Sequence, residues 1–92
     1  MAAAITPRTK EIFIANPNNP TGDFMDEADF EKIAQQGLPF IIDEAYIEFP
    51  DSPPDTLRYV REGRNACVLR TFSKIHGLAG LRVGYGLAPP HL

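Results

Sequence analysis

The stretch EIFIANPNNPTGDFMDEADFEKIAQQGLPFIID, residues 11–43, decides the fold of this chain. EIFIAN, residues 11–16, is short and apolar, and the prolines, asparagines and glycine that follow it end a strand in a loop. DEADFEKIAQQG, residues 26–37, has acids in its first turn, apolar residues at helical spacing and a terminal glycine, which predicts a helix. PFIID, residues 39–43, has consecutive apolar residues, as in a parallel strand covered on both faces. The stretch therefore predicts a strand–helix–strand unit with a right-handed crossover.

Three further segments follow this unit along the chain. DTLRYVREG, residues 55–63, comes after a proline-rich loop and predicts a short helix that ends at a glycine. ACVLRTF, residues 66–72, predicts a third strand, and RVGYGLA, residues 82–88, predicts a fourth. About ten residues separate these two strands, fewer than the dozen or more that a parallel crossover needs, so the fourth strand is expected to be antiparallel. The sequence thus predicts one α/β domain over residues 1–92 with a mostly parallel sheet, one antiparallel strand, and unpaired edges on the first and third strands.

Composition and charge exclude several classes of function. Of the 92 residues, 43% are hydrophobic and 23% are charged, which is ordinary for a globular protein. The net charge is -3 and the cations are scattered, so no basic face for nucleic acid is expected. No apolar run approaches the roughly 18 residues of a membrane-spanning helix, and MAAAITPRTK does not have the apolar run of a leader peptide. The single cysteine, Cys67, lies in an apolar segment and is expected to be a buried thiol in a cytoplasmic protein.

A polar cluster follows each of the three parallel strands. These clusters are Asn16 to Thr21; Asp43, Glu44 and Tyr46; and Thr71, Ser73 and Lys74. Each cluster alone is also consistent with a turn, a solvated strand end or a surface pair. The carboxyl ends of parallel strands share one edge of a sheet, and ligands of open α/β sheets bind beyond that edge. The three clusters together therefore predict a site that offers an amide, a carboxylate, a phenol and an amine.

The last cluster opens a glycine-rich stretch, TFSKIHGLAGLRVGYG, residues 71–86, which contains one lysine and one arginine. A glycine-rich loop with two solvated cations is the plainer interpretation of this stretch alone. A lysine amine can also form a Schiff base with an aldehyde, and a carboxylate is the usual partner of the pyridine nitrogen of pyridoxal phosphate. The combination of lysine and carboxylate at one edge favours chemistry with this cofactor.

NPNNPTG, IIDEAY and TFSKIHGLAGLRVG together resemble the motif series of the fold-type I, pyridoxal-phosphate-dependent aminotransferases of class I/II. Among them, the order and spacing are most similar to those of the histidinol-phosphate aminotransferases, over residues 5–88. The resemblance implies that residues 1–92 are a central fragment of the large, cofactor-binding domain. It also implies pyridoxal 5'-phosphate as the cofactor and no metal ion.

The resemblance implies roles at the cofactor ring for four residues. Lys74 would be the catalytic lysine that forms the Schiff base and shuttles the proton between Cα and C4′. Asp43 would pair with the pyridinium nitrogen; strand alternation does not choose between Asp43 and Glu44, and only the family pattern selects Asp43. Asn19 and Tyr46 would hydrogen-bond the phenolic oxygen of the cofactor.

The resemblance assigns the phosphate end of the cofactor to three other residues. Ser73 and Arg82 would hold the phosphate, with help from Thr71, because a guanidinium fork suits phosphate geometry. His76 departs from the family pattern, since relatives often carry Tyr or Phe there. We interpret His76 as a packing residue without a catalytic role.

The function implied by the resemblance is transamination between histidinol phosphate and 2-oxoglutarate in histidine biosynthesis, with a small-molecule amino donor, a 2-oxo acid and a homodimeric full-length protein. Aromatic aminotransferase and threonine-phosphate decarboxylase remain alternatives, as does a non-catalytic truncated product, because the shared motifs bind the cofactor and not the substrate. The family's chain is several times longer. Its phosphate-cupping turn, ring-stacking aromatic residue and carboxylate-binding arginine are not among these residues, so the 92-residue chain alone is expected to be inactive.

Overall fold

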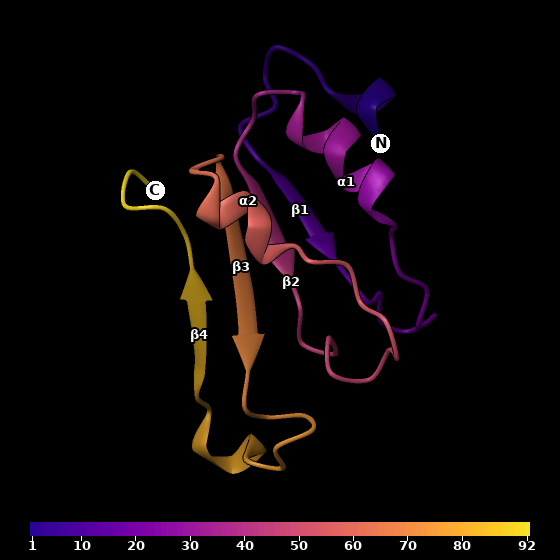
Figure 1. Cartoon of the computed structure of the whole chain (residues 1–92), viewed down its shortest axis with the longest axis vertical. Coiled ribbons are helices and arrows are strands. Elements are labelled where there is room, and N and C mark those ends of the chain that lie inside the picture. The colour runs from indigo at the N-terminus through magenta and orange to yellow at the C-terminus, as the bar shows by residue number, and fades with distance from the viewer.

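The computed structural model describes residues 1–92 and contains a four-stranded sheet with two helices on one of its faces (Figure 1). The elements, with two short 3-10 helices labelled η, are η1 Ala2–Ala4, β1 Ile12–Ala15, α1 Glu27–Ala34, β2 Phe40–Asp43, α2 Leu57–Arg61, β3 Ala66–Thr71, η2 Ala79–Leu81 and β4 Gly84–Leu87. The strand order is β1-β2-β3-β4; the first three strands are parallel and β4 is antiparallel to β3. The predicted α/β fold, with a mostly parallel sheet and one antiparallel strand, is confirmed.

Both helices lie on the same side because each connection moves one strand further in the same direction across the sheet. Ile14 of β1 lies beside Ile42 of β2, which lies beside Val68 of β3. Crossovers of one hand that step in one direction place their helices on one face. We call this the covered face and the other the open face.

Helix α1 confirms the expectation from its sequence. Asp26 is the N-cap, and its side chain accepts a hydrogen bond from the backbone N–H of Asp29 at 2.9 Å. Glu27 and Asp29 add negative charge to the first turn, where the helix dipole favours it. The predicted terminal glycine, Gly37, follows the helix with a φ of 72°, which a residue without a Cβ adopts at little cost.

The core lies between the sheet and the two helices. Its nine buried residues are Ile12, Ile14, Phe30, Ile33, Phe40, Ile42, Tyr59, Ala66 and Val68. Tyr59 of α2 packs edge-on against Phe40, with 5.5 Å between the ring centroids. The strand residues of this list occupy alternate positions, so the core is built on the covered face alone.

The expectation that β2 is covered on both faces is wrong. On the open face, Ile41 is only partly buried and Phe13 of β1 is 56% exposed, because no helix packs there. The same absence of a second helical layer leaves Cys67 of β3 partly buried, so the prediction of a buried thiol is also wrong.

The edges of the sheet differ from the expectation as well. β3 is paired on both sides, since Val68 to Thr71 pair with Leu87 to Gly84 of β4. The edge strands are therefore β1 and β4, and not β1 and β3. No helix of the structure has the length and apolar character needed to cross a membrane.

Candidate functional site

The polar clusters at the carboxyl ends of the parallel strands surround a small cavity of about 260 Å³. Its lining residues are Ala15, Pro17, Asn19, Asp43, Ala45, Tyr46 and Lys74. Four of the seven site residues predicted from the sequence are in this set, each from a different turn or strand end: Asn19, Asp43, Tyr46 and Lys74. We call this space the Lys74 cavity.

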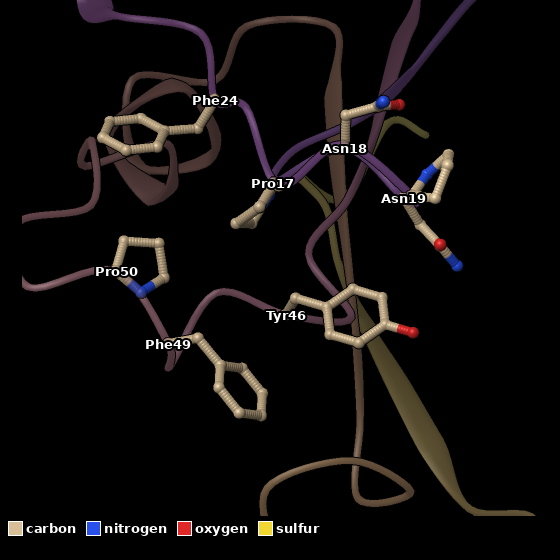
Figure 2. Close-up of a pocket in the computed structure, with 9 residues that line it drawn as sticks. Pro17, Asn18, Asn19, Phe24, Tyr46, Phe49 and Pro50 are labelled. Carbon is tan, nitrogen blue, oxygen red and sulfur yellow. The ribbon is translucent and has the colours of Figure 1, made fainter.

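Tyr46, with Pro17 and Asn19, lines both the Lys74 cavity and a larger neighbouring cavity of about 420 Å³. The Nζ atom of Lys74 lies 5.0 Å from the centroid of the Tyr46 ring, close enough for a cation–π interaction. The Phe49 ring is 6.0 Å from the Tyr46 ring. Figure 2 shows the Tyr46 hydroxyl and the Asn19 amide directed to the same side. The amine, the phenol and the amide are therefore gathered around one small space.

Asp43 and Glu44 are adjacent carboxylates with opposite surroundings. Asp43 ends β2 on the open face, lines the Lys74 cavity, and accepts a hydrogen bond from the backbone N–H of Ala45 at 3.1 Å. Glu44 is 0% exposed. One of its oxygens accepts a hydrogen bond from the Thr56 hydroxyl, and the other accepts one from Nε of Arg70 at 2.8 Å. Only Asp43 can therefore present a carboxylate to a ligand in the cavity.

Arg70 keeps its charge beside Glu44. Burial by itself lowers the pKa of the Arg70 guanidinium, but the hydrogen bond and the negative charge of Glu44, with a smaller contribution from Tyr85, outweigh it and raise the pKa above its ordinary value. The guanidinium is therefore charged where it contacts the buried Glu44 side chain.

The three residues predicted to bind a phosphate do not line the Lys74 cavity. The Thr71 hydroxyl oxygen accepts a hydrogen bond from the backbone N–H of Ser73 at 3.1 Å. Arg82 is exposed, follows η2 with a φ of 52°, and donates from Nη1 to the carbonyl of Ala79 at 3.1 Å. The four residues predicted to contact the cofactor ring thus line one cavity, and the three predicted to bind its phosphate do not line it.

His76 lies near the surface of the same loop. Its ring centroid is 5.5 Å from that of Phe72, and its Nε2 atom is 3.9 Å from a carboxylate oxygen of Glu48. The ring contact with Phe72 agrees with the interpretation of His76 as a packing residue, although its side chain is half exposed.

A group of three polar residues lies on the covered face, although the sequence analysis had assigned two of them, Asn16 and Glu44, to the clusters of the site and had not singled out the third. These are Asn16, Glu44 and Arg70, which follow the last buried apolar residues of their strands, Ile14, Ile42 and Val68, at a spacing of two. Because side chains of a strand alternate between its faces, the burial of Ile14, Ile42 and Val68 places these three on the covered face as well, but the consecutive apolar residues of the sequence did not show this alternation.

Comparison with known proteins shows which family carries this arrangement. The family model described as "Aminotransferase class I and II" matches residues 1–92. A histidinol-phosphate aminotransferase from Akkermansia muciniphila is 57% identical over 90 residues, which cover 95% of this chain and 25% of that protein. An aromatic amino acid aminotransferase from Mycolicibacterium smegmatis is 50% identical over an alignment of 97 residues, gaps included, which covers 100% of this chain and 27% of that protein.

A solved structure of the same kind has a similar backbone. The histidinol-phosphate aminotransferase from Sinorhizobium meliloti, in complex with pyridoxal-5'-phosphate, superposes with a TM-score of 0.73 at 38% identity, covering 89% of this chain and 23% of that one. This chain spans about a quarter of the length of the curated relatives it matches. Its sequence matches the family over all 92 residues, and the chain therefore belongs to the class I and II aminotransferases, a pyridoxal-phosphate-dependent family.

Proposed function

We propose that this chain is the cofactor-binding part of an aminotransferase that transfers an amino group between histidinol phosphate and 2-oxoglutarate. The observation that supports it is the meeting of the Lys74 amine, the Asp43 carboxylate, the Asn19 amide and the Tyr46 phenol in one cavity. A lysine amine and a carboxylate partner for the ring nitrogen are the groups that pyridoxal phosphate chemistry uses, and the amide and the phenol add hydrogen-bonding groups beside them.

The residues present fit the ring of pyridoxal 5'-phosphate. An amine and a carboxylate on one cavity match its aldehyde and its ring nitrogen, and an amide and a phenol can donate hydrogen bonds to its phenolic oxygen. When bound, the cofactor supplies an electron-withdrawing ring that accepts the electron pair released when the substrate loses its Cα proton. Ser73, Thr71 and Arg82 would hold the phosphate.

Each residue of the Lys74 cavity then has a distinct task. Lys74 Nζ would bind the aldehyde and afterwards carry a proton to and from the substrate carbon. The Asp43 carboxylate would accept a hydrogen bond from the ring nitrogen and stabilise its protonated form, and the bond from Ala45 holds this carboxylate in place. Asn19 and Tyr46 would orient the ring by hydrogen bonds to its oxygen.

The substrate assignment has a second candidate. Relatives named for histidinol phosphate and for aromatic amino acids are 57% and 50% identical to this chain. The higher identity supports histidinol phosphate, and an aromatic amino acid is the alternative donor. We also propose that the whole protein is a cytoplasmic homodimer, as the resemblance to the family implies.

The test is a visible-absorbance titration of the 92-residue chain with pyridoxal phosphate, followed by borohydride reduction and peptide mapping. The chain has three lysines, Lys10, Lys32 and Lys74, so the unsubstituted protein contains its own reference sites. We expect labelling to be concentrated on Lys74 and to disappear in Lys74→Ala. Equal labelling of all three lysines would contradict the proposal.

A second variant tests the role of the carboxylate. Asp43→Asn keeps an oxygen that can accept the Ala45 hydrogen bond but removes the charge. We expect the fold to be unchanged by circular dichroism and the affinity for pyridoxal phosphate to fall several-fold. Unchanged affinity would remove Asp43 from the site. Histidinol phosphate and phenylalanine, added to a full-length aminotransferase that contains this segment, compare the two donors through the change in absorbance of the cofactor.

A further inference from the structure

A row of polar side chains crosses the covered face directly beyond the apolar core. Asn16, Glu44 and Arg70 lie in register on neighbouring strands, one step past the pairs Ala15–Asp43 and Asp43–Leu69. The backbone N–H groups of Asn16 and Glu44 continue the ladder to the carbonyls of Asp43 and Leu69, both at 2.9 Å. We call these three residues the polar row.

Two members of the polar row close the loops that carry the cavity residues. Asn16 Oδ1 accepts a hydrogen bond from the backbone N–H of Met25 at 2.6 Å, which closes the loop that contains Asn19. The Glu44 carboxylate accepts a hydrogen bond from the Thr56 hydroxyl, and this bond closes the loop that contains Tyr46. The ion pair of Glu44 with Arg70 then joins the ends of β2 and β3, four residues before Lys74. The polar row therefore closes two of the loops that line the Lys74 cavity and ties β2 to the strand after which the third loop begins.

Stability alone does not explain a buried ion pair at this position. Glu44 is fully buried, and the side chain of Arg70 is 24% exposed. Apolar residues of similar volume commonly replace such pairs with no loss of stability, because removing two charges from water is costly. Glu44 is enclosed by this chain's own atoms, and the partly exposed Arg70 is its charged partner. The polar character of the pair points to a role in placing the neighbouring residues.

We propose that Glu44 and Arg70 are positioning residues for the Lys74 cavity: from the covered face, their ion pair fixes the strand ends from which Asp43 and Lys74 reach the open face. This inference rests on the proposed function. Neither residue lines the cavity, so both act through the backbone that they share with Asp43 and Lys74. Directional bonds fix such geometry more narrowly than apolar contacts do.

Three variants separate a positioning role from a merely structural one. Glu44→Ala removes the ion pair, Glu44→Gln keeps oxygen and nitrogen atoms that can bond Arg70 and Thr56, and the double variant Glu44→Leu/Arg70→Met replaces the pair by apolar contacts. The readouts are the thermal midpoint, the share of borohydride-fixed pyridoxal phosphate on Lys74 relative to Lys10 and Lys32, and amide hydrogen exchange at Ala45, which donates to Asp43. Arg61→Gln, which breaks the surface pair with Asp55, is the matched control.

We expect Glu44→Ala to lower the midpoint, to reduce the Lys74 share several-fold and to speed exchange at Ala45. Glu44→Gln should retain most of the Lys74 share, and Arg61→Gln should retain all of it. The double variant should recover the midpoint but neither the Lys74 share nor the slow exchange. A double variant that recovers all three properties would overturn the inference. If the unsubstituted chain shows no preference for Lys74, the proposed function fails, and exchange at Ala45 still decides whether the pair positions Asp43.

Discussion

The two faces of the sheet use the same strands for different purposes. On the covered face, Ile12, Ile14, Phe40, Ile42, Ala66 and Val68 pack against α1 and α2, and the polar row follows them. On the open face, Phe13 is exposed, Ile41 and Cys67 are partly buried, and Asp43 reaches the Lys74 cavity. Side chains of a strand alternate between its two faces, so neighbouring residues differ in role: those on the covered face stabilise the fold, and those on the open face are available to the candidate chemistry.

Asp43 and Glu44 show what this division teaches. They are adjacent and chemically alike, yet one lines a cavity and the other is enclosed by Thr56 and Arg70. The type of residue therefore does not indicate its role here; the face of the sheet does. The comparison of the two faces can be tested by matched substitutions.

The largest effect is expected from a matched pair of phenylalanines. Phe40 on the covered face is 1% exposed, and Phe13 on the open face of the neighbouring strand is 56% exposed. Phe40→Ala should lower the free energy of unfolding by about 3–5 kcal/mol, since it removes a buried ring and leaves a cavity. Phe13→Ala should change it by less than about 1 kcal/mol. Urea denaturation followed by circular dichroism measures both, and equal losses would show that the open face is also packed.

A smaller effect is expected at two glycines of β4. A Cβ atom at Gly84 would lie 2.8 Å from the backbone oxygen of Arg70, whereas one at Gly86 would lie 3.2 Å from a methyl group of Leu69. A backbone atom cannot move aside without disturbing the β3–β4 ladder, so Gly84→Ala should cost about 1–3 kcal/mol. The Leu69 side chain can rotate, so Gly86→Ala should stay within about 0.5 kcal/mol. The same urea denaturation distinguishes them; similar losses would place the two glycines in equivalent surroundings.

Much of the fold was predictable from the sequence because local signals agreed with one another. The Asp26 cap, the terminal glycine of α1 and the apolar strand segments predicted every main element, and the short connection before β4 predicted its antiparallel direction. Apolar runs predict burial but not the layer that provides it, so the open face was wrongly expected to be covered. The edge strands were misassigned because the sequence did not show that β4 pairs with β3. This pairing uses the edge of β3 that does not pair with β2, so β3 has no free edge.

The candidate site was predictable in part for a related reason. The carboxyl ends of parallel strands meet by topology, so the polar residues that follow these ends were expected at one edge of the sheet. Ser73 and Lys74 are neighbours in the loop between β3 and β4, and the conformation of this loop decides that Lys74 lines the cavity while Ser73 and Arg82 do not. The burial of Glu44 depends on Thr56, which comes from a distant loop. Neither is visible in a local pattern.

The smallest expected effect concerns Cys67, which lies on the open face of β3 between two residues of the buried core, Ala66 and Val68. Because no helix covers it, its thiol should react with a soluble disulfide reagent in the folded chain within a few-fold of its rate in urea. Cys67→Ser should change the free energy of unfolding by less than about 1 kcal/mol, since the side chain is already partly exposed. Val68→Ala, one position along, is the matched substitution on the covered face and should cost more, since it removes buried methyl groups. A thiol that reacts only after unfolding would mean that the open face is covered in solution, and this would contradict the division of the sheet into a covered face and an open face.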